Sequence, residues 1–244
     1  MNNTLGQKKE LKIEICCGSV DDVVAAASAG VHRIEFNSAL ELGGLTPSLG
    51  MLRLARAATD IEIISMLRPR GGGFWYSDKE FETMLLDLPL LLENGSDGLA
   101  FGILTQNGEL DDARCKILLD EMAKYGKDKV AVFHMAFDEA MTDEFEMLSR
   151  LDALGFARVL TKGRAENAMM GTESLRKYVE YTKERGLRLE ILPGGGVRPH
   201  NAAEIVARTG ACQLHGKLHR DVGGEVDVVD AVALREYLEW AKGN

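Results

Sequence analysis

Residues 61–95 read IEIISMLRPRGGGFWYSDKEFETMLLDLPLLLENG, and this stretch holds one complete strand–loop–helix unit. The run IEIISML at 61–67 is apolar and short, which is typical of a buried strand. The glycines at 71–73 predict a loop after it. A Ser-Asp pair then opens a helical stretch that ends near Gly95, and Pro89 is expected to kink that helix.

The same alternation of strand-like and helix-like segments extends along the chain. A helix is predicted over 19–30, from the N-cap Ser19 to the terminating Gly30, and an amphipathic helix closes the chain over 227–244. The predicted strands lie at 11–17, 32–37, 61–67, 98–104, 129–135, 157–161, 187–192 and 211–216.

Alternating strands and helices imply a parallel sheet. Eight such units in 244 residues predict an α/β fold, a closed parallel eight-stranded (β/α)8 TIM barrel. A doubly wound open sheet is the alternative. Residues 1–10 are expected to form a flexible N-terminal tail, and residues 11–244 a single barrel domain.

Composition excludes several classes of function. The formal net charge of −9 argues against a nucleic-acid partner, which would call for a basic surface. No run approaches about 18 uninterrupted apolar residues, and the N-terminus does not resemble a signal peptide, so neither a membrane span nor secretion is expected. The four cysteines are scattered, which favours reduced thiols and a cytoplasmic location.

In a (β/α)8 barrel, functional groups gather where the strands end. The first predicted strand carries Glu14 and Cys16, and the second carries Arg33, Glu35 and Asn37. Alternation places each set on one face of its strand. Because charges inside a barrel are costly unless paired, these residues predict either a Glu–Arg pair that ties two strands together or a polar site in the barrel mouth.

The third strand delivers Arg68 and Arg70 on either side of Pro69. Two guanidinium groups beside a rigid proline suit a clamp on a carboxylate or phosphate, and the glycines that follow let backbone approach a ligand. The alternative is a solvated surface loop.

The fifth strand ends at His134, and Asp138 follows in the loop. An imidazole at this position can exchange protons near neutral pH, although a structural histidine is the alternative. His215 lies on the eighth strand and is a candidate substrate-binding residue.

Gly194, Gly195 and Gly196 follow the seventh strand and precede a helix expected to start near Pro199. Glycine-rich backbone before a helix suits phosphate, and barrels often hold phosphate in this region. Lys162 follows the sixth strand, where it is either a Schiff-base candidate or an exposed loop lysine.

The sequence shows no evident zinc site, but two sets of soft ligands are conceivable. Cys16 with Met66, and Cys212 with Met135, would suit copper(I). Buried cysteine and methionine that only fill the core are the alternative.

These residues resemble the CutC family, long labelled copper homeostasis proteins. The matching stretches run in order over residues 11–216 and read IEIC, HRIEF, LELGGLTPS, MLRPRGGGFWYS, FGILTQNGELD, FHMAFDEA, RVLTKG and LPGGGVRPHN. The resemblance implies a barrel fold, a cytoplasmic location, self-association and copper binding. Copper proposals for the family look to cysteines at the ends of the first two strands, where this chain has Cys16 and Asn37.

Two hypotheses follow for the function. In the first, the protein takes part in copper homeostasis and binds copper(I) through Cys16. In the second, it is an enzyme that acts on a small anionic or phosphorylated metabolite. In the second hypothesis, Arg68 and Arg70 hold the anion, and Glu14 or Glu35 is the base. His134 is the proton donor, and Arg33 steers the carboxylates.

Overall fold

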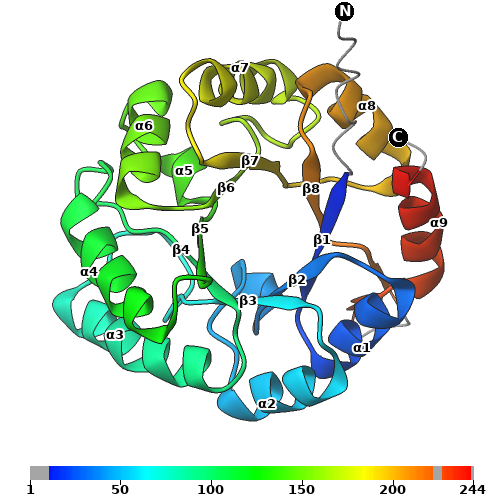
Figure 1. Cartoon of the computed structure of the whole chain (residues 1–244), viewed down its shortest axis with the longest axis horizontal. Coiled ribbons are helices and arrows are strands. Elements are labelled where there is room, and N and C mark those ends of the chain that lie inside the picture. Colours follow the sequence, from blue (N-terminus) through cyan, green and yellow to red (C-terminus); the bar gives the residue numbers. More distant parts are fainter. Residues whose placement is uncertain (1–10, 222–226, 243–244) are drawn as a thin grey trace, which may run out of the picture.

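The computed structural model describes residues 11–221 and 227–242. Strands and helices alternate around a central axis, with the strands inside and the helices outside (Figure 1). The barrel strands are β1 Lys12–Cys17, β2 Arg33–Phe36, β3 Glu62–Met66, β4 Gly98–Phe101, β5 Val130–Phe133, β6 Arg158–Thr161, β7 Glu190–Pro193 and β8 Gln213–Gly216.

The helices follow the strands in the order that the sequence predicts. They are α1 Val20–Ala29, α2 Leu49–Ala58, α3 Asp78–Glu93, α4 Asp112–Met122, α5 Ala136–Glu139, α6 Glu144–Leu154, α7 Thr172–Glu184, α8 Pro199–Thr209 and α9 Ala231–Lys242. Two 3-10 turns, η1 Leu40–Leu42 and η2 Ala123–Tyr125, and a small hairpin of β9 His219–Asp221 and β10 Asp227–Val229 complete the described elements.

Local signals explain where the helices begin and end. The Ser19 side chain accepts a hydrogen bond from Asp22 N at the start of α1, and Gly30 ends that helix in the left-handed conformation. Ser77 and Glu80 form a reciprocal capping box at the start of α3. Pro89 lies inside α3, which continues past it as one helix.

Parallel pairing joins the strands in the order β7-β6-β5-β4-β3-β2-β1-β8. The two end strands lie next to each other (Figure 1), and Gln213 on β8 donates to Ile191 O on β7 at 3.2 Å. The sheet is therefore a nearly closed barrel, and the predicted (β/α)8 fold is confirmed over the open-sheet alternative.

Alternate residues of each strand serve two different cores. Ile13, Ile15 and Cys17 of β1 belong to the large cluster between sheet and helices, where full burial of one isoleucine contributes about 1.5–3 kcal/mol. The apolar part of the barrel interior is a smaller cluster, contributed by β3 to β7: Ile64, Met66, Ala100, Val132, Leu160 and Leu192.

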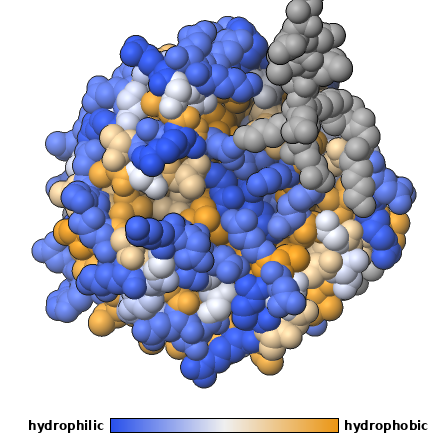
Figure 2. Space-filling model, viewed as in Figure 1, coloured by the Kyte–Doolittle hydropathy of each residue, from blue (hydrophilic) through white to orange (hydrophobic). Residues whose placement is uncertain are grey.

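The rest of the barrel interior is polar. Apart from Arg158 of β6, its buried residues come from β1, β2 and β8, with Asn37 just after β2: Glu14, Cys16, Arg33, Glu35, Asn37, Gln213 and His215. In the view down the barrel, hydrophilic residues cover the centre of the face, and hydrophobic patches lie around them (Figure 2). The interior is thus divided between an apolar side and a polar side.

The predicted closing helix over 227–244 is corrected at its start. Residues 227–229 pair with β9 as β10, and the Asp230 carboxylate accepts from Val232 N and Ala233 N, so α9 begins at Ala231. The predicted tail at 1–10 lies outside the described residues, and the single-domain boundary of 11–244 stays a prediction. Within 11–221 and 227–242, the structure contains no helix with the length and apolarity needed to cross a bilayer.

Candidate functional site

Three neighbouring strands, β8, β1 and β2, bring the polar side of the interior together. The register places Glu14 beside Arg33 on one side and beside His215 on the other, and it places Cys16 beside Glu35. Neighbouring strands lie about 4.8 Å apart, so inward side chains at paired positions contact one another. Two layers result, one around Glu14 and one around Cys16.

The first layer is a buried ion pair. Arg33 Nε donates to Glu14 Oε2, and Arg33 Nη2 donates to Gln213 Oε1 at 2.6 Å. His215 Nδ1 lies 2.7 Å from Glu14 Oε1. Glu14 and Arg33 are each only 1% exposed, so each charge depends on the other for its solvation. This layer fixes the orientation of the His215 ring.

The second layer is a group of possible metal ligands that we call the triad: Cys16, Glu35 and His215. One ligand atom from each lies within 4.8 Å of the others, and all three residues are buried. The Asn37 amide donates to Glu35 Oε2 at 3.0 Å and to Cys16 Sγ at 3.5 Å, which holds these two side chains in place. Glu35 Oε1 and Asn37 Oδ1 are buried without a hydrogen-bond partner in the described structure.

Burial and neighbouring charges set the protonation of the triad. Burial raises the pKa of the Cys16 thiol to about 11 and also raises the pKa of Glu35. Burial opposes a charge on His215, but Glu35, Cys16 and Glu14 together hold the pKa of this imidazole well above its usual value. Burial likewise opposes the Glu14 charge, yet Arg33 and His215 keep the pKa of that carboxyl low. Cys16 therefore keeps its thiol proton near neutral pH, and a cation that bound its sulfur would displace that proton.

His134 follows β5, and Arg68 follows β3. The Phe74 ring lies between them, 4.8 Å from Arg68 Cζ and 4.7 Å from the centroid of the His134 ring. Burial and the Arg68 charge lower the pKa of His134 to about 3, so this histidine is neutral at pH 7. Its Nδ1 accepts a weak hydrogen bond from Ala136 N at 3.4 Å, which places the ring proton on Nε2.

The two arginines of the predicted anion clamp are engaged with backbone carbonyl oxygens, Arg68 in two loops and Arg70 in its own loop. The Arg68 guanidinium donates to the carbonyl oxygens of residues 42–44 and of Gly72. Arg70 pairs with Glu80 and donates to the carbonyl oxygens of Gly71, Gly73 and Trp75. A planar fork with several donors suits this bracing of loops. These contacts give Arg70 a role in bracing its loop, and the anion clamp stays a prediction.

Two other predicted sites lie apart from the ion-pair layer around Glu14. Asp138 accepts from Thr161 Oγ1 and from the backbone N–H groups of Lys162 and Arg164, so it braces the loop after β6. Of the three loop glycines, Gly194 lies close to that layer, because a Cβ on Gly194 would meet His215 Cβ at 3.3 Å. Phosphate binding by Gly194, Gly195 and Gly196 stays a prediction.

The structure also shows what the sequence reasoning missed. Arg158 on β6 is buried and donates to Glu62 on β3 at 2.7 Å across the barrel interior. The signal was present, because a charged residue inside an apolar strand needs a partner. The suggested pairing of Cys212 with Met135 is wrong, because Cys212 precedes β8 and Met135 follows β5, at opposite ends of parallel strands.

Comparison with known proteins gives consistent matches. A model of the CutC family matches residues 11–219. The chain is 46% identical over 207 residues to a family protein CutC of Treponema denticola, covering 85% of this chain and 81% of that one. It is 38% identical over 203 residues to the copper homeostasis protein cutC homolog of Homo sapiens, covering 83% and 71%. The crystal structure of the protein assigned as CutC from Streptococcus agalactiae matches with a TM-score of 0.75 at 33% identity, covering 84% and 98%.

Proposed function

The chain belongs to the CutC family, and from this premise we propose that it takes part in copper homeostasis by binding a copper ion at the triad. The observation that carries the proposal is the convergence of Cys16, Glu35 and His215, with ligand atoms within 4.8 Å of one another inside the barrel. Copper is the cargo in this proposal and not a resident cofactor.

The donor set suits copper in two respects. A thiolate is a soft ligand that selects copper(I), and an imidazole is a good ligand for copper as well. Divalent copper also lies above zinc in the usual order of affinity for nitrogen, oxygen and sulfur ligands. The second cysteine position is Asn37, so Cys16 supplies the thiolate and His215 supplies the second favourable donor.

The surroundings of His215 support the same assignment. A metal-binding histidine commonly donates its other ring N–H to a carboxylate, which fixes the tautomer and the orientation of the ring. Glu14 Oε1 lies 2.7 Å from His215 Nδ1, and Arg33 holds the opposite oxygen of that carboxylate. The remaining nitrogen, Nε2, lies 3.9 Å from Glu35 Oε2, on the side of the triad.

Competition with a coloured copper(I) chelator under reducing conditions tests the proposal. We expect the wild-type protein to retain copper, and Cys16→Ser and His215→Gln to lose it. Cys212→Ser is the matched control, because it removes a thiol that lies at the other end of the barrel. A wild-type protein that surrenders all copper to the chelator, or a Cys16→Ser variant that keeps it, would refute the assignment.

A second candidate function is binding of a small anionic metabolite, followed by acid–base chemistry. One observation favours it: in the part of the chain that the structure describes, Arg68 Nε and His134 Nε2 are buried donors without a partner. Buried donors are rarely left unpaired, and two of them suit a carboxylate or phosphate oxygen. With its low pKa, His134 would act as a neutral hydrogen-bond donor.

Thermal shift with small carboxylates and sugar phosphates tests this candidate. We expect a stabilising anion whose effect is lost in His134→Phe, a change that keeps the aromatic contact with Phe74. His200→Phe, on the exposed surface of α8, is the control. Failure of every anion to stabilise the protein would refute this candidate and leave the copper assignment intact.

A cytoplasmic location and self-association are also part of the proposal. They are supported by the family resemblance and by the scattered positions of the four cysteines in the sequence. Sedimentation of the purified protein tests the second of these expectations. A single monomeric species at all concentrations would contradict it.

A further inference from the structure

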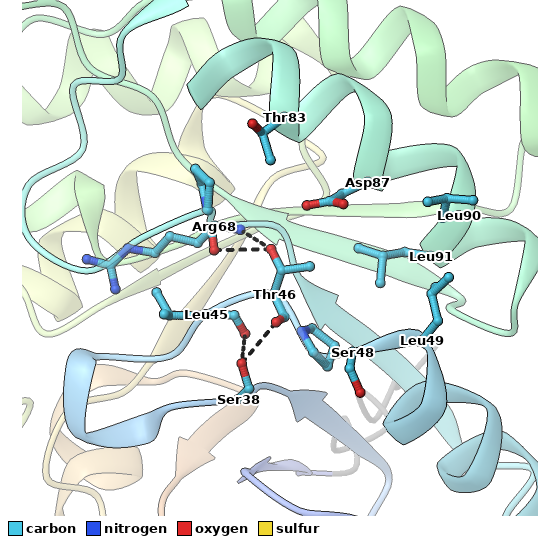
Figure 3. Close-up of a pocket in the computed structure, with 12 residues that line it drawn as sticks. Ser38, Leu45, Thr46, Ser48, Leu49, Arg68, Thr83, Asp87, Leu90 and Leu91 are labelled. Carbon is cyan, nitrogen blue, oxygen red and sulfur yellow. Dashed lines mark hydrogen bonds between the residues drawn. The ribbon is translucent and has the colours of Figure 1, made fainter. Parts of the chain in front are cut away.

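A cavity of about 380 Å³ lies outside the barrel, between the ends of β2 and β3 and the face of α3 (Figure 3). This size is within the range of small-molecule sites. Its apolar lining is formed by Leu45, Pro47, Leu49, Pro69, Leu90 and Leu91. Its polar lining includes the carboxylate of Asp87 and several hydroxyl groups. None of the roles proposed above uses this cavity.

One wall of the cavity is fixed by hydrogen bonds among its own residues. Thr46 Oγ1 donates to Arg68 O at 3.1 Å and accepts from Arg68 N at 2.9 Å, and Ser38 Oγ donates to Thr46 O at 2.9 Å (Figure 3). These polar groups are therefore satisfied. The Arg68 side chain extends away from Asp87 in Figure 3, and its guanidinium is bound to carbonyl oxygens elsewhere.

Asp87 carries the carboxylate of this cavity. Its side chain projects from α3 toward the wall formed by Thr46 and Arg68 (Figure 3). Among the residues that the structure describes, no hydrogen bond or ion pair engages its carboxylate. Partial burial raises the pKa of Asp87, and no neighbouring cation offsets that effect. A carboxylate in this setting gains from a cation that enters the cavity.

The cavity also holds two hydroxyl groups, Thr83 with acceptor capacity and Ser48 with a proton left to donate. Thr83 lies one turn before Asp87 on α3 and gives its proton to Lys79 O, so its oxygen still has acceptor capacity. Ser48 Oγ accepts from Met51 N at the start of α2. The lining thus combines a carboxylate and two hydroxyl groups with leucine and proline walls, and the negative charge of Asp87 disfavours an anion as the occupant.

We propose that this cavity binds a primary ammonium group carried on a short aliphatic chain, with Asp87 as its counter-ion. The ammonium has three donors for the carboxylate and the Thr83 oxygen, and the aliphatic chain covers Leu49, Leu90 and Leu91. A bare metal ion fits less well, because one carboxylate supplies few ligands and the triad is the one cluster of ligand residues found in the described chain.

Titration with n-butylammonium, followed by NMR of the backbone amides, tests the proposal. We expect shifts confined to residues around the cavity, and an affinity about tenfold or more above that of Asp87→Asn. Glu93→Gln is the matched control, because it removes one negative charge from an exposed position of the same helix. Thr83→Met leaves the Asp87 carboxylate in the chain but narrows the cavity and removes the Thr83 hydroxyl, so it is expected to weaken binding as well.

The neutral alcohol n-butanol separates charge recognition from apolar contact. The proposal is overturned if n-butylammonium causes no localised shifts, if it binds Asp87→Asn as well as wild type, or if n-butanol binds equally. The amide of Nα-acetyl-lysine carries the same ammonium group. If this compound binds more tightly than n-butylammonium, the natural ligand is the side chain of a protein lysine. If it binds more weakly, the natural ligand is a free amine, and both results support the proposed recognition of an ammonium group.

Discussion

Replacement of Glu14 by glutamine tests the buried centre of the barrel most directly. The change removes one negative charge and keeps the shape of the side chain. It leaves Arg33 as a cation with 1% exposure and takes the ionic partner from His215 Nδ1. Loss of one member of a buried ion pair typically costs about 3–5 kcal/mol, because the remaining charge stays desolvated.

Two features of the structure place the expected cost near the lower end of that range. Gln213 Oε1 still accepts from Arg33 Nη2 at 2.6 Å, and His215 can release its proton when Glu14 no longer stabilises it. We therefore expect a loss of about 3 kcal/mol in the free energy of unfolding at pH 7, or roughly 6–12 °C in Tm for a domain of this size.

Urea unfolding followed by circular dichroism measures this loss, with Glu93→Gln as an exposed control expected to stay within about 0.5 kcal/mol. The double variant Glu14→Gln/Arg33→Met removes both charges and should lose less than the sum of the single variants. A Glu14→Gln loss below about 1 kcal/mol, or strict additivity in the double variant, would refute the idea that these charges depend on each other.

Three further predictions follow from the same geometry. The folded-state pKa of Cys16 is raised from 9.0 to about 11, so its contribution to stability is complete below pH 9 and is lost as pH rises toward 11. Ultraviolet absorbance of thiolates should show an ionisation step near pH 11 that Cys16→Ser removes, and a Cys16 step near pH 9 would contradict this. The pKa of His134 is lowered from 6.5 to about 3, so its contribution to stability is present above pH 6.5 and is lost as pH falls toward 3. The NMR signals of its ring should stay constant between about pH 5 and 8, and a titration midpoint near pH 6.5 would show that burial does not lower this pKa. Arg68→Met should speed hydrogen exchange of the loop at 42–44, because the Arg68 guanidinium joins it to Gly72. Arg70→Met removes contacts within its own loop and a partly exposed pair with Glu80, so it should leave exchange at 42–44 unchanged and change stability by less than about 1 kcal/mol; equal exchange at 42–44 in both variants would show that Arg68 has no special role there.

Much of the fold could be predicted because it is encoded locally. Apolar runs and helix caps such as Ser19 and Ser77 specify the order of the elements. The start of α9 could not be found in this way, because residues 227–229 pair as a strand with 219–221. That pairing depends on contacts made after the chain has folded back, and not on the helical pattern of the segment itself.

The candidate site was likewise predictable only where its features are encoded locally. Alternation along β1 and β2 is enough to place Glu14 with Cys16 and Arg33 with Glu35 inside the barrel. The direction of Arg68 is not encoded locally, because its acceptors are carbonyl oxygens from the loop at 42–44. The same loop lies close to Asn37. Gly44 permits this approach because its φ is 85° and it has no Cβ, which would meet Asn37 Oδ1 at 2.4 Å.

Asn37 links this loop to the proposed copper site. A cysteine in its place would supply a second thiolate, but it would remove the amide that donates to both Cys16 Sγ and Glu35 Oε2. With the amide present, the Glu35 carboxylate stays oriented toward Cys16 and His215, and the proposed ligand set is one sulfur, one nitrogen and one oxygen. Asn37→Cys should therefore tighten copper(I) binding relative to wild type while it loosens the position of Glu35.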